Sequence, residues 1–139
     1  MQKINCTKAV VKLKKSKIIY IDIQPNVVFE KDDFNELFDA VQLLGNGNRY
    51  YHIIKVGQHT LPHKDARELS SSKEGSVFKK ADAFVVSTMA QKIMVDIMTK
   101  INRPVVPTKA FSTVKAAKIW INSLEVKEKQ EMKSNNVLH

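Results

Sequence analysis

In the second half of the chain, the pattern of apolar and polar residues predicts a strand, a helix, a second strand and a second helix in succession. Residues 81–87 contain an unbroken apolar run, which is typical of a central strand covered on both faces. An apolar stripe at helical spacing follows over 88–101, and the pattern repeats as a strand at 105–111 and a helix at 112–124. This alternation predicts parallel strands joined by right-handed crossovers.

The first half of the chain predicts an antiparallel hairpin. Its two short strands, 8–14 and 17–24, are separated only by Lys15-Ser16. Apolar residues at helical spacing then predict a helix, an apolar segment predicts a strand, and a proline suits the first turn of a short helix. These elements are expected at 31–44, at 49–56 and from Pro62 onward.

The predicted fold class is therefore α/β. We expect a mixed five-stranded sheet that opens with the hairpin and continues in parallel βα units, with about four helices. A length of 139 residues suits one domain with one core. We expect a flexible N-terminus at 1–7, the domain at 8–124 and a charged, partly disordered tail at 125–139.

The composition indicates in which kind of compartment the protein acts. No apolar run approaches the roughly 20 residues that a membrane-spanning helix needs, so no membrane span is expected. The N-terminus lacks a secretory pattern. Cys6 is the only cysteine, so no disulfide forms within the chain, and we expect a reducing compartment, most simply the cytoplasm.

The net charge of +9 is concentrated at the N-terminus. Six lysines precede the first acidic residue, Asp22, which raises nucleic-acid binding as one interpretation. Such a surface usually also carries arginines and stacking aromatics, but only Tyr20 is near and the first arginine is Arg49. We therefore favour the interpretation that these lysines protect an edge strand from pairing with other sheets. The six are Lys3, Lys8, Lys12, Lys14, Lys15 and Lys17.

Several local strings, together with the order of elements, resemble the STAS family over about residues 8–124. The similarity is greatest to small uncharacterised bacterial STAS-like proteins, and CRAL-TRIO lipid-transfer domains have a related fold. The resemblance implies a non-catalytic regulatory module that binds a protein partner. The strings are Asp65-Ala66-Arg67-Glu68, Ala83-Phe84-Val85-Val86, Lys100-Ile101-Asn102-Arg103-Pro104, Phe111 and Ala116-Ala117-Lys118-Ile119-Trp120-Ile121.

The resemblance also directs attention to the loop after the strand at 49–56. In the regulated family members, a serine at the start of the following helix is phosphorylated, and an Asp-Ser pair marks it. That pair is absent here, and Thr60 is the hydroxyl in the corresponding place, so it is the candidate phosphoacceptor or, alternatively, a helix cap. Because loops at the carboxyl ends of parallel strands gather binding groups, we expect a partner to bind at Gly57, Gln58, His59 and Thr60.

No set of residues predicts a reaction. His59 and His63 are four apart, but Pro62 lies between them and no third ligand is evident, so no metal site is expected. Cys6 has only lysines nearby and no base, and phosphate-binding glycine motifs are absent. We expect no enzyme activity and no cofactor.

Two alternatives to protein binding stay open. The first is a carrier of a small apolar ligand or lipid, which would need a cavity between helix and sheet. The second is nucleic-acid binding through the basic hairpin. Methionines at 89, 94 and 98 are expected in the core, although methionines also build adaptable binding surfaces. A homodimer is also left open.

Overall fold

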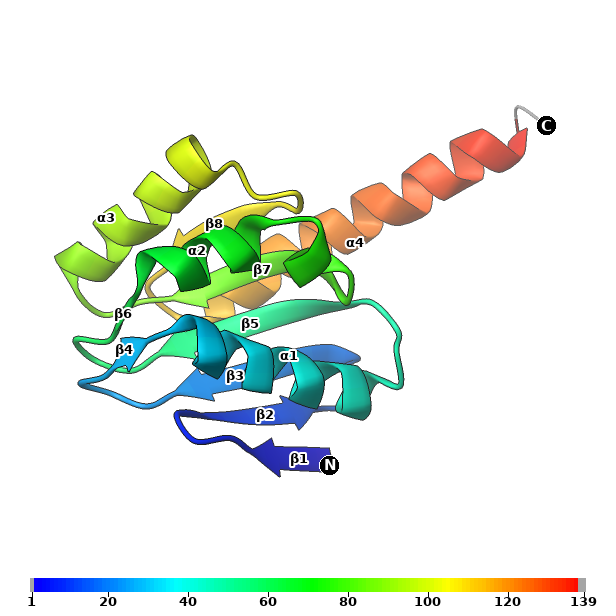
Figure 1. Cartoon of the computed structure of the whole chain (residues 1–139). Helices are drawn as coiled ribbons and strands as arrows, with labels where there is room; N and C mark the ends of the chain where they lie inside the picture. The colour runs from blue at the N-terminus through cyan, green and yellow to red at the C-terminus, as the bar shows by residue number, and fades with distance from the viewer. Residues whose placement is uncertain (1, 138–139) are drawn as a thin grey trace.

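Six strands form the central sheet (Figure 1). The computed structural model describes residues 2–137. In spatial order the strands are β1 (Gln2–Asn5), β2 (Ala9–Leu13), β3 (Ile18–Ile23), β5 (Tyr50–Val56), β7 (Lys79–Val85) and β8 (Thr108–Phe111). β2 is antiparallel to both of its neighbours, β1 and β3, whereas β3, β5, β7 and β8 run parallel to one another. Two short strands, β4 (Val28–Phe29) and β6 (Leu61–Pro62), pair separately in a small parallel sheet.

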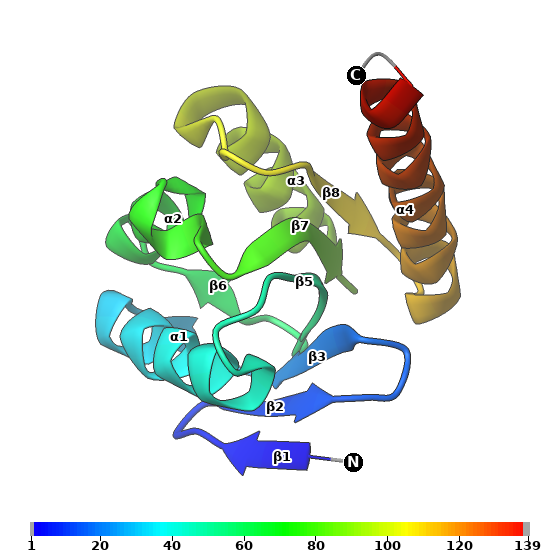
Figure 2. The same cartoon turned by 90° about the vertical axis from the view of Figure 1, so that its right-hand side faces the viewer.

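Helices cover both faces of the sheet (Figure 2). On one face lie α1 (Lys31–Gly45), α2 (Lys64–Ser71) and α3 (Met89–Ile97), and on the other lies α4 (Val114–Val137). A 3-10 turn, η1 (Glu74–Ser76), follows α2, and a π-helical turn, η2 (Met98–Asn102), continues α3.

The predicted fold class is confirmed. The strands expected at 49–56, 81–87 and 105–111 lie side by side in parallel as β5, β7 and β8, and the N-terminal hairpin is antiparallel. The last strand lies at the sheet edge and begins only at Thr108, directly after Pro107, which has no N–H to donate to a ladder.

The prediction of a flexible segment at 1–7 and of five strands is wrong, because residues 2–5 form the edge strand β1. The side chain of Ile4 packs against the core on the α1 side of the sheet. The backbone N–H of Thr7 also donates to Oε1 of Glu36 on α1 at 2.9 Å. Of the N-terminal lysines, Lys8 pairs with Asp33 at 2.7 Å.

Alternating side chains of the strands supply two separate cores. On the α1 side, Ile19 and Ile21 of β3 pack with Leu37 and Val41 of α1. On the α4 side, Ile53 of β5 packs among residues that include Ala83 of β7 and Ala117 and Ile121 of α4. A strand covered on both faces must be apolar at nearly every position, which explains the unbroken run at 83–86.

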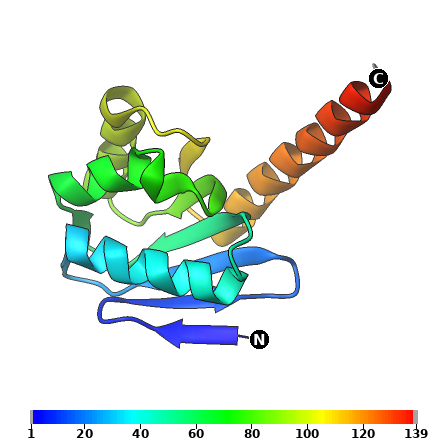
Figure 3. The ribbon, with the colours of Figure 1, turned by 45° about the vertical axis from the view of Figure 1, so that its right-hand side comes forward.

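The C-terminal segment differs from the expected partly disordered tail, since α4 continues through Val137 and projects beyond the sheet (Figure 3). One reason is a contact that sequence spacing does not reveal. Oε2 of Glu128 accepts a hydrogen bond from the hydroxyl of Tyr51 at 2.6 Å, and Oε1 lies 3.0 Å from Nζ of Lys80. Residues 138–139 lie outside the described residues. Over residues 2–137, no helix is both long enough and apolar enough to span a membrane.

Candidate functional site

The loop expected to bind a partner connects β5 to β6. Gln58 and His59 are exposed, Gly57 is partly buried, and Thr60 is almost completely buried with 1% of its surface exposed. His59 adopts a left-handed backbone conformation with φ 66°. The loop therefore exposes two side chains, those of Gln58 and His59.

Thr60 holds this loop against the connection between β3 and β4. Its hydroxyl donates to the backbone oxygen of Gln24 at 2.6 Å and accepts from the backbone N–H of Val27 at 3.2 Å. The hydroxyl is buried by these contacts, so phosphorylation of Thr60 would require the loop to open. Its predicted role as a phosphoacceptor stays a prediction that depends on that opening.

Gly57 is required because the backbone of the β3–β4 connection passes against it. A Cβ atom at Gly57 would lie 2.4 Å from the carbonyl carbon of Gln24 and 2.4 Å from the nitrogen of Pro25. Backbone atoms at that distance do not yield as a flexible side chain would. A side chain at the first residue of the loop would therefore clash with the β3–β4 connection.

Gln91 fixes the same loop from the other side. Its Nε2 donates to the backbone oxygens of Gly57 at 2.8 Å and Thr60 at 3.0 Å, and its Oε1 accepts from the N–H of Ser87. Gln91 also takes part in the N-terminal cap of α3, where its backbone N–H donates to the hydroxyl of Thr88 at 3.2 Å.

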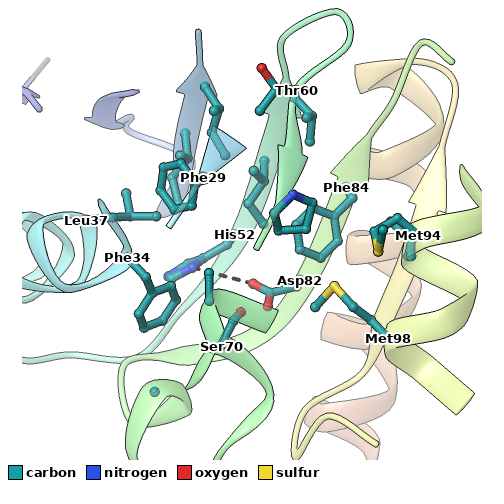
Figure 4. Close-up of a pocket in the computed structure, with 18 of the residues that line it drawn as sticks. Phe29, Phe34, Leu37, His52, Thr60, Ser70, Asp82, Phe84, Met94 and Met98 are labelled. Atoms are coloured by element: carbon teal, nitrogen blue, oxygen red, sulfur yellow. Dashed lines mark ion pairs between the residues drawn. The ribbon is translucent and has the colours of Figure 1, made fainter. Parts of the chain in front are cut away.

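A cavity of about 110 Å³ lies between the sheet and the three helices α1, α2 and α3 (Figure 4). Most of the side chains that line the cavity are aromatic or aliphatic, and they come from the sheet and from α1, α2 and α3. For comparison, an apolar cavity of about 150 Å³ takes up benzene. The aromatic and methionine lining residues are Phe29, Phe34, Phe38, Phe78, Phe84, Met94 and Met98.

The cavity exists because α2 stands away from the strands. The closest backbone neighbours of α2 are α1, η1 and η2, rather than any strand. The side of α2 that lines the cavity carries a small buried residue, Ala66, which does not fill the space beneath the helix. Of the methionines expected in the core, Met94 and Met98 line this cavity, whereas Met89 is 71% exposed.

One end of the cavity is polar, with His52 of β5 and Asp82 of β7 side by side. They are partners in the register of the two parallel strands, and Nδ1 of His52 lies 3.7 Å from Oδ1 of Asp82 (Figure 4). Nζ of Lys79 lies 2.5 Å from Oδ2 of Asp82 and donates to both the backbone oxygen and the hydroxyl of Ser70, at 2.8 and 3.2 Å. All three of these charged or titratable residues are buried.

Burial lowers the pKa of His52 to about 4, against the opposing attraction of Asp82, so the imidazole is neutral at pH 7. Its Nε2 is buried and has no hydrogen-bond partner among residues 2–137. Nζ of Lys79 has three oxygens within hydrogen-bond distance, one on Asp82 and two on Ser70.

Sequence reasoning missed His52, Lys79 and Asp82 as a group. One indication was available from strand alternation. His52 lies two residues before Ile54, and Asp82 lies two residues before Phe84, so each points to the same face of its strand as that apolar residue. A polar residue at such a position needs a buried partner.

The histidines considered as metal ligands do not form a metal site within the described residues. No three His, Cys, Asp or Glu side chains there lie close enough to hold an ion. His63 instead caps α2, where its Nδ1 lies 2.8 Å from Oδ1 of Asp65.

Comparison with solved structures shows the same fold in another protein. An uncharacterised protein of the DUF3478 family from Shewanella loihica PV-4, which has a SpoIIAA-like fold, superimposes with a TM-score of 0.59. The match covers 86% of this chain and 98% of that one at 13% sequence identity, which supports the STAS-like fold. No curated protein matches this sequence. Residues 11–125 match the family described as "Domain of unknown function (DUF7793)", and the chain belongs to that family.

Proposed function

We propose that this protein is a non-catalytic binding module that takes up a small apolar molecule in the cavity beneath α2. The observation that carries the proposal is the cavity of about 110 Å³ with its aromatic and aliphatic lining. Apolar space of this kind excludes water and favours apolar occupants. Among the alternatives drawn from the sequence, the ligand carrier is the one that needs such a space.

The position of α2 supports uptake of the ligand. A helix whose backbone neighbours are other helices and turns can shift away from the sheet without breaking strand pairing. A molecule larger than the resting cavity then needs a displacement of α2, which also breaks the two hydrogen bonds from Lys79 of β7 to Ser70. The π-helical turn η2, which contacts α2, is a type of irregularity that often occurs at functional sites.

Toluene is a suitable probe for the proposal, with thermal unfolding as the readout. At ten times its Kd, a ligand stabilises the folded state by about 1.4 kcal/mol. For a domain of this size that raises Tm by roughly 4 °C. Absence of any shift at toluene saturation, with no binding heat in calorimetry, would overturn the proposal.

A cavity-filling variant locates the binding. Ala66→Leu adds three carbon atoms to a side chain that lines the cavity, whereas Ala90→Leu adds the same atoms at an exposed position of α3. Toluene should raise the Tm of the wild type and of Ala90→Leu, but not that of Ala66→Leu. Equal shifts in all three proteins would place toluene elsewhere.

A protein partner at the β5–β6 loop is the second candidate function. The observation that favours it is the fixed backbone of the loop, which Thr60 and Gln91 anchor while Gln58 and His59 remain exposed. A rigid loop loses little conformational entropy when it binds. Chemical cross-linking from Gln58→Cys in cells should yield a discrete adduct that His59→Ala weakens; an adduct unaffected by His59→Ala would count against the loop.

A further inference from the structure

We infer that the apolar ligand donates one hydrogen bond to Nε2 of His52, and that it is therefore an apolar molecule with a single neutral O–H or N–H group. The inference rests on the proposed function and names the chemical class of its ligand. Its basis is one nitrogen atom in the wall of the cavity that is shielded from water and has no hydrogen-bond partner within residues 2–137.

The two ring nitrogens of His52 have different surroundings. A neutral imidazole has a single N–H group. The ring makes a hydrogen bond to the backbone oxygen of Phe78, and Nε2 has no partner within residues 2–137, so the N–H group is that of Nδ1. Nδ1 also lies 3.7 Å from Oδ1 of Asp82. Nε2 therefore carries the lone pair and can only accept a hydrogen bond.

Nε2 of His52 is a buried acceptor at the cavity. His52 lines the cavity and is only 6% exposed. Within residues 2–137, the buried side-chain atoms that lack a partner belong to His52, Arg67 and Ser71, and of these residues only His52 lines the cavity. A buried acceptor without a partner loses the hydrogen bond that it made to water in the unfolded chain. A donor on the ligand would restore that bond.

The other polar side chains at the cavity already have partners. The hydroxyl of Thr60 donates to one backbone group and accepts from another. The side-chain amide of Gln91 donates twice and accepts once. The hydroxyl of Ser70 accepts from Lys79, whose charge is matched by Asp82. These groups can form further hydrogen bonds, but none of them needs the ligand for its first.

Water is a poor occupant of the space beside Nε2. A buried water molecule typically makes about three hydrogen bonds to polar groups. In Figure 4 the ring of His52 points toward Phe34 and Leu37 of α1, which also line the cavity. An apolar ligand with one donor suits this wall better, because its body contacts the apolar side chains while its donor reaches Nε2.

An acceptor on the ligand does not suit this position. The lone pair of Nε2 and that of an ether or carbonyl oxygen repel each other, and a carboxylate adds a negative charge in the low dielectric of the cavity. Burial lowers the pKa of His52 to about 4, which opposes uptake of the proton that would turn Nε2 into a donor. The ligand is therefore neutral, with phenols, alcohols and pyrroles as examples of the class.

Two pairs of benzene derivatives test the inference, and titration calorimetry at pH 7 measures their binding. Phenol and toluene match in size, but only phenol donates; anisole and ethylbenzene also match, but anisole only accepts. The Kd for phenol should be about fivefold below that for toluene, as one net hydrogen bond provides. Anisole should bind no more tightly than ethylbenzene. Toluene binding as tightly as phenol, or anisole binding more tightly than ethylbenzene, would overturn the inference and leave the proposed cavity site intact.

The variant His52→Phe identifies the atom that accepts from phenol. It keeps an aromatic ring and removes Nε2, and the backbone oxygen of Phe78 still accepts from the N–H of Tyr50 at 3.3 Å. Phenol should then bind no more tightly than toluene, because its hydroxyl is buried without a partner. Ser70→Ala is the matched control, since it removes another hydroxyl at the cavity and should leave the preference for phenol at about fivefold. A preference that survives His52→Phe, or that disappears in Ser70→Ala, would overturn the role of Nε2.

NMR spectroscopy of the wild type decides the inference if His52→Phe does not fold. Acceptance of a hydrogen bond moves the resonance of an unprotonated imidazole nitrogen upfield. Phenol should therefore move the Nε2 resonance of His52 upfield, and toluene should not; equal shifts with both compounds would contradict the inference. Failure of the proposed function has a different signature, in which none of the four compounds binds.

Discussion

The hydroxyl of Tyr51 donates a hydrogen bond of 2.6 Å to Oε2 of Glu128, which joins β5 to the projecting half of α4. The two residues are 77 positions apart in the sequence. Burial and this bond raise the pKa of Tyr51, so its hydroxyl stays protonated as the donor across the physiological range. The contact joins α4 to the sheet near the point where the helix projects beyond it (Figure 3).

Removing this tie should loosen the end of α4. In Glu128→Ala we expect amide hydrogen exchange over residues 129–135 to accelerate about fivefold, as the loss of one net hydrogen bond allows. Glu131→Ala is the matched control, since it makes the same change one turn on, at an exposed residue. Equal acceleration in both variants would mean that the Tyr51 contact does not hold the helix.

Stability should depend on pH through His52. Its pKa is lowered from 6.5 to about 4 on folding, so the unfolded chain binds the proton first as pH falls. The contribution is complete above pH 6.5, is lost between pH 6.5 and 4, and amounts to roughly 3 kcal/mol. Urea unfolding across this window should show a steeper fall in the free energy of unfolding for wild type than for His52→Phe.

The control for this pH dependence is His59→Asn, which removes an exposed histidine while keeping a residue that tolerates the positive φ at that position. Its pH profile should follow that of the wild type. Parallel profiles for wild type and His52→Phe would show that His52 is not the group that titrates.

Lys79 should be far more important to stability than other lysines of the sheet. Lys79→Met leaves Asp82 charged and buried without its partner, which costs about 3–5 kcal/mol. Lys12→Met removes the partner of Asp22 in a half-exposed pair, and should cost less than about 1 kcal/mol. Chemical denaturation measures both variants, and similar losses would contradict the assignment of a buried ion pair.

Replacement of Gly57 should distort the loop before β6. The Cβ of Gly57→Ala would overlap the backbone of Gln24 and Pro25, so we expect a loss of more than about 2 kcal/mol in the free energy of unfolding. Gly47→Asn is the control, because Gly47 has open space around it and Asn tolerates its φ of 75°. An unaltered stability in Gly57→Ala would show that the two connections can separate freely.

The parts of the fold that the sequence predicts are those in which local pattern and burial agree. The hairpin and the parallel strands follow from apolar runs such as 83–86, where burial on both faces requires apolar residues. Strand β1 was missed because Gln2, Lys3 and Asn5 are polar, so the segment shows no apolar alternation. Ile4 is its apolar contact with the core. The helical end of α4 was missed because its tie, Tyr51 with Glu128, is a tertiary contact.

The candidate site was only partly predictable. The exposure of Gln58 and His59 follows from their place in a loop, but the burial of Thr60 depends on Gln24 and Val27 from a distant connection. A cavity is a property of the distance between α2 and the sheet, and no local pattern encodes that distance. Strand alternation predicts that His52 and Asp82 point to the same face of their strands as Ile54 and Phe84. Their pairing could not be predicted, because it depends on the register of β5 and β7.

Xenon is the most direct probe of the central claim, that the space beneath α2 accepts an apolar occupant. Xenon enters dry apolar cavities and scatters X-rays strongly enough to be located without ambiguity. In crystals pressurised with xenon, we predict a difference peak enclosed by Phe34, Phe84 and Met98. A structure in which that space holds no xenon, with the side chains of α2 packed directly on β5 and β7, would contradict the account.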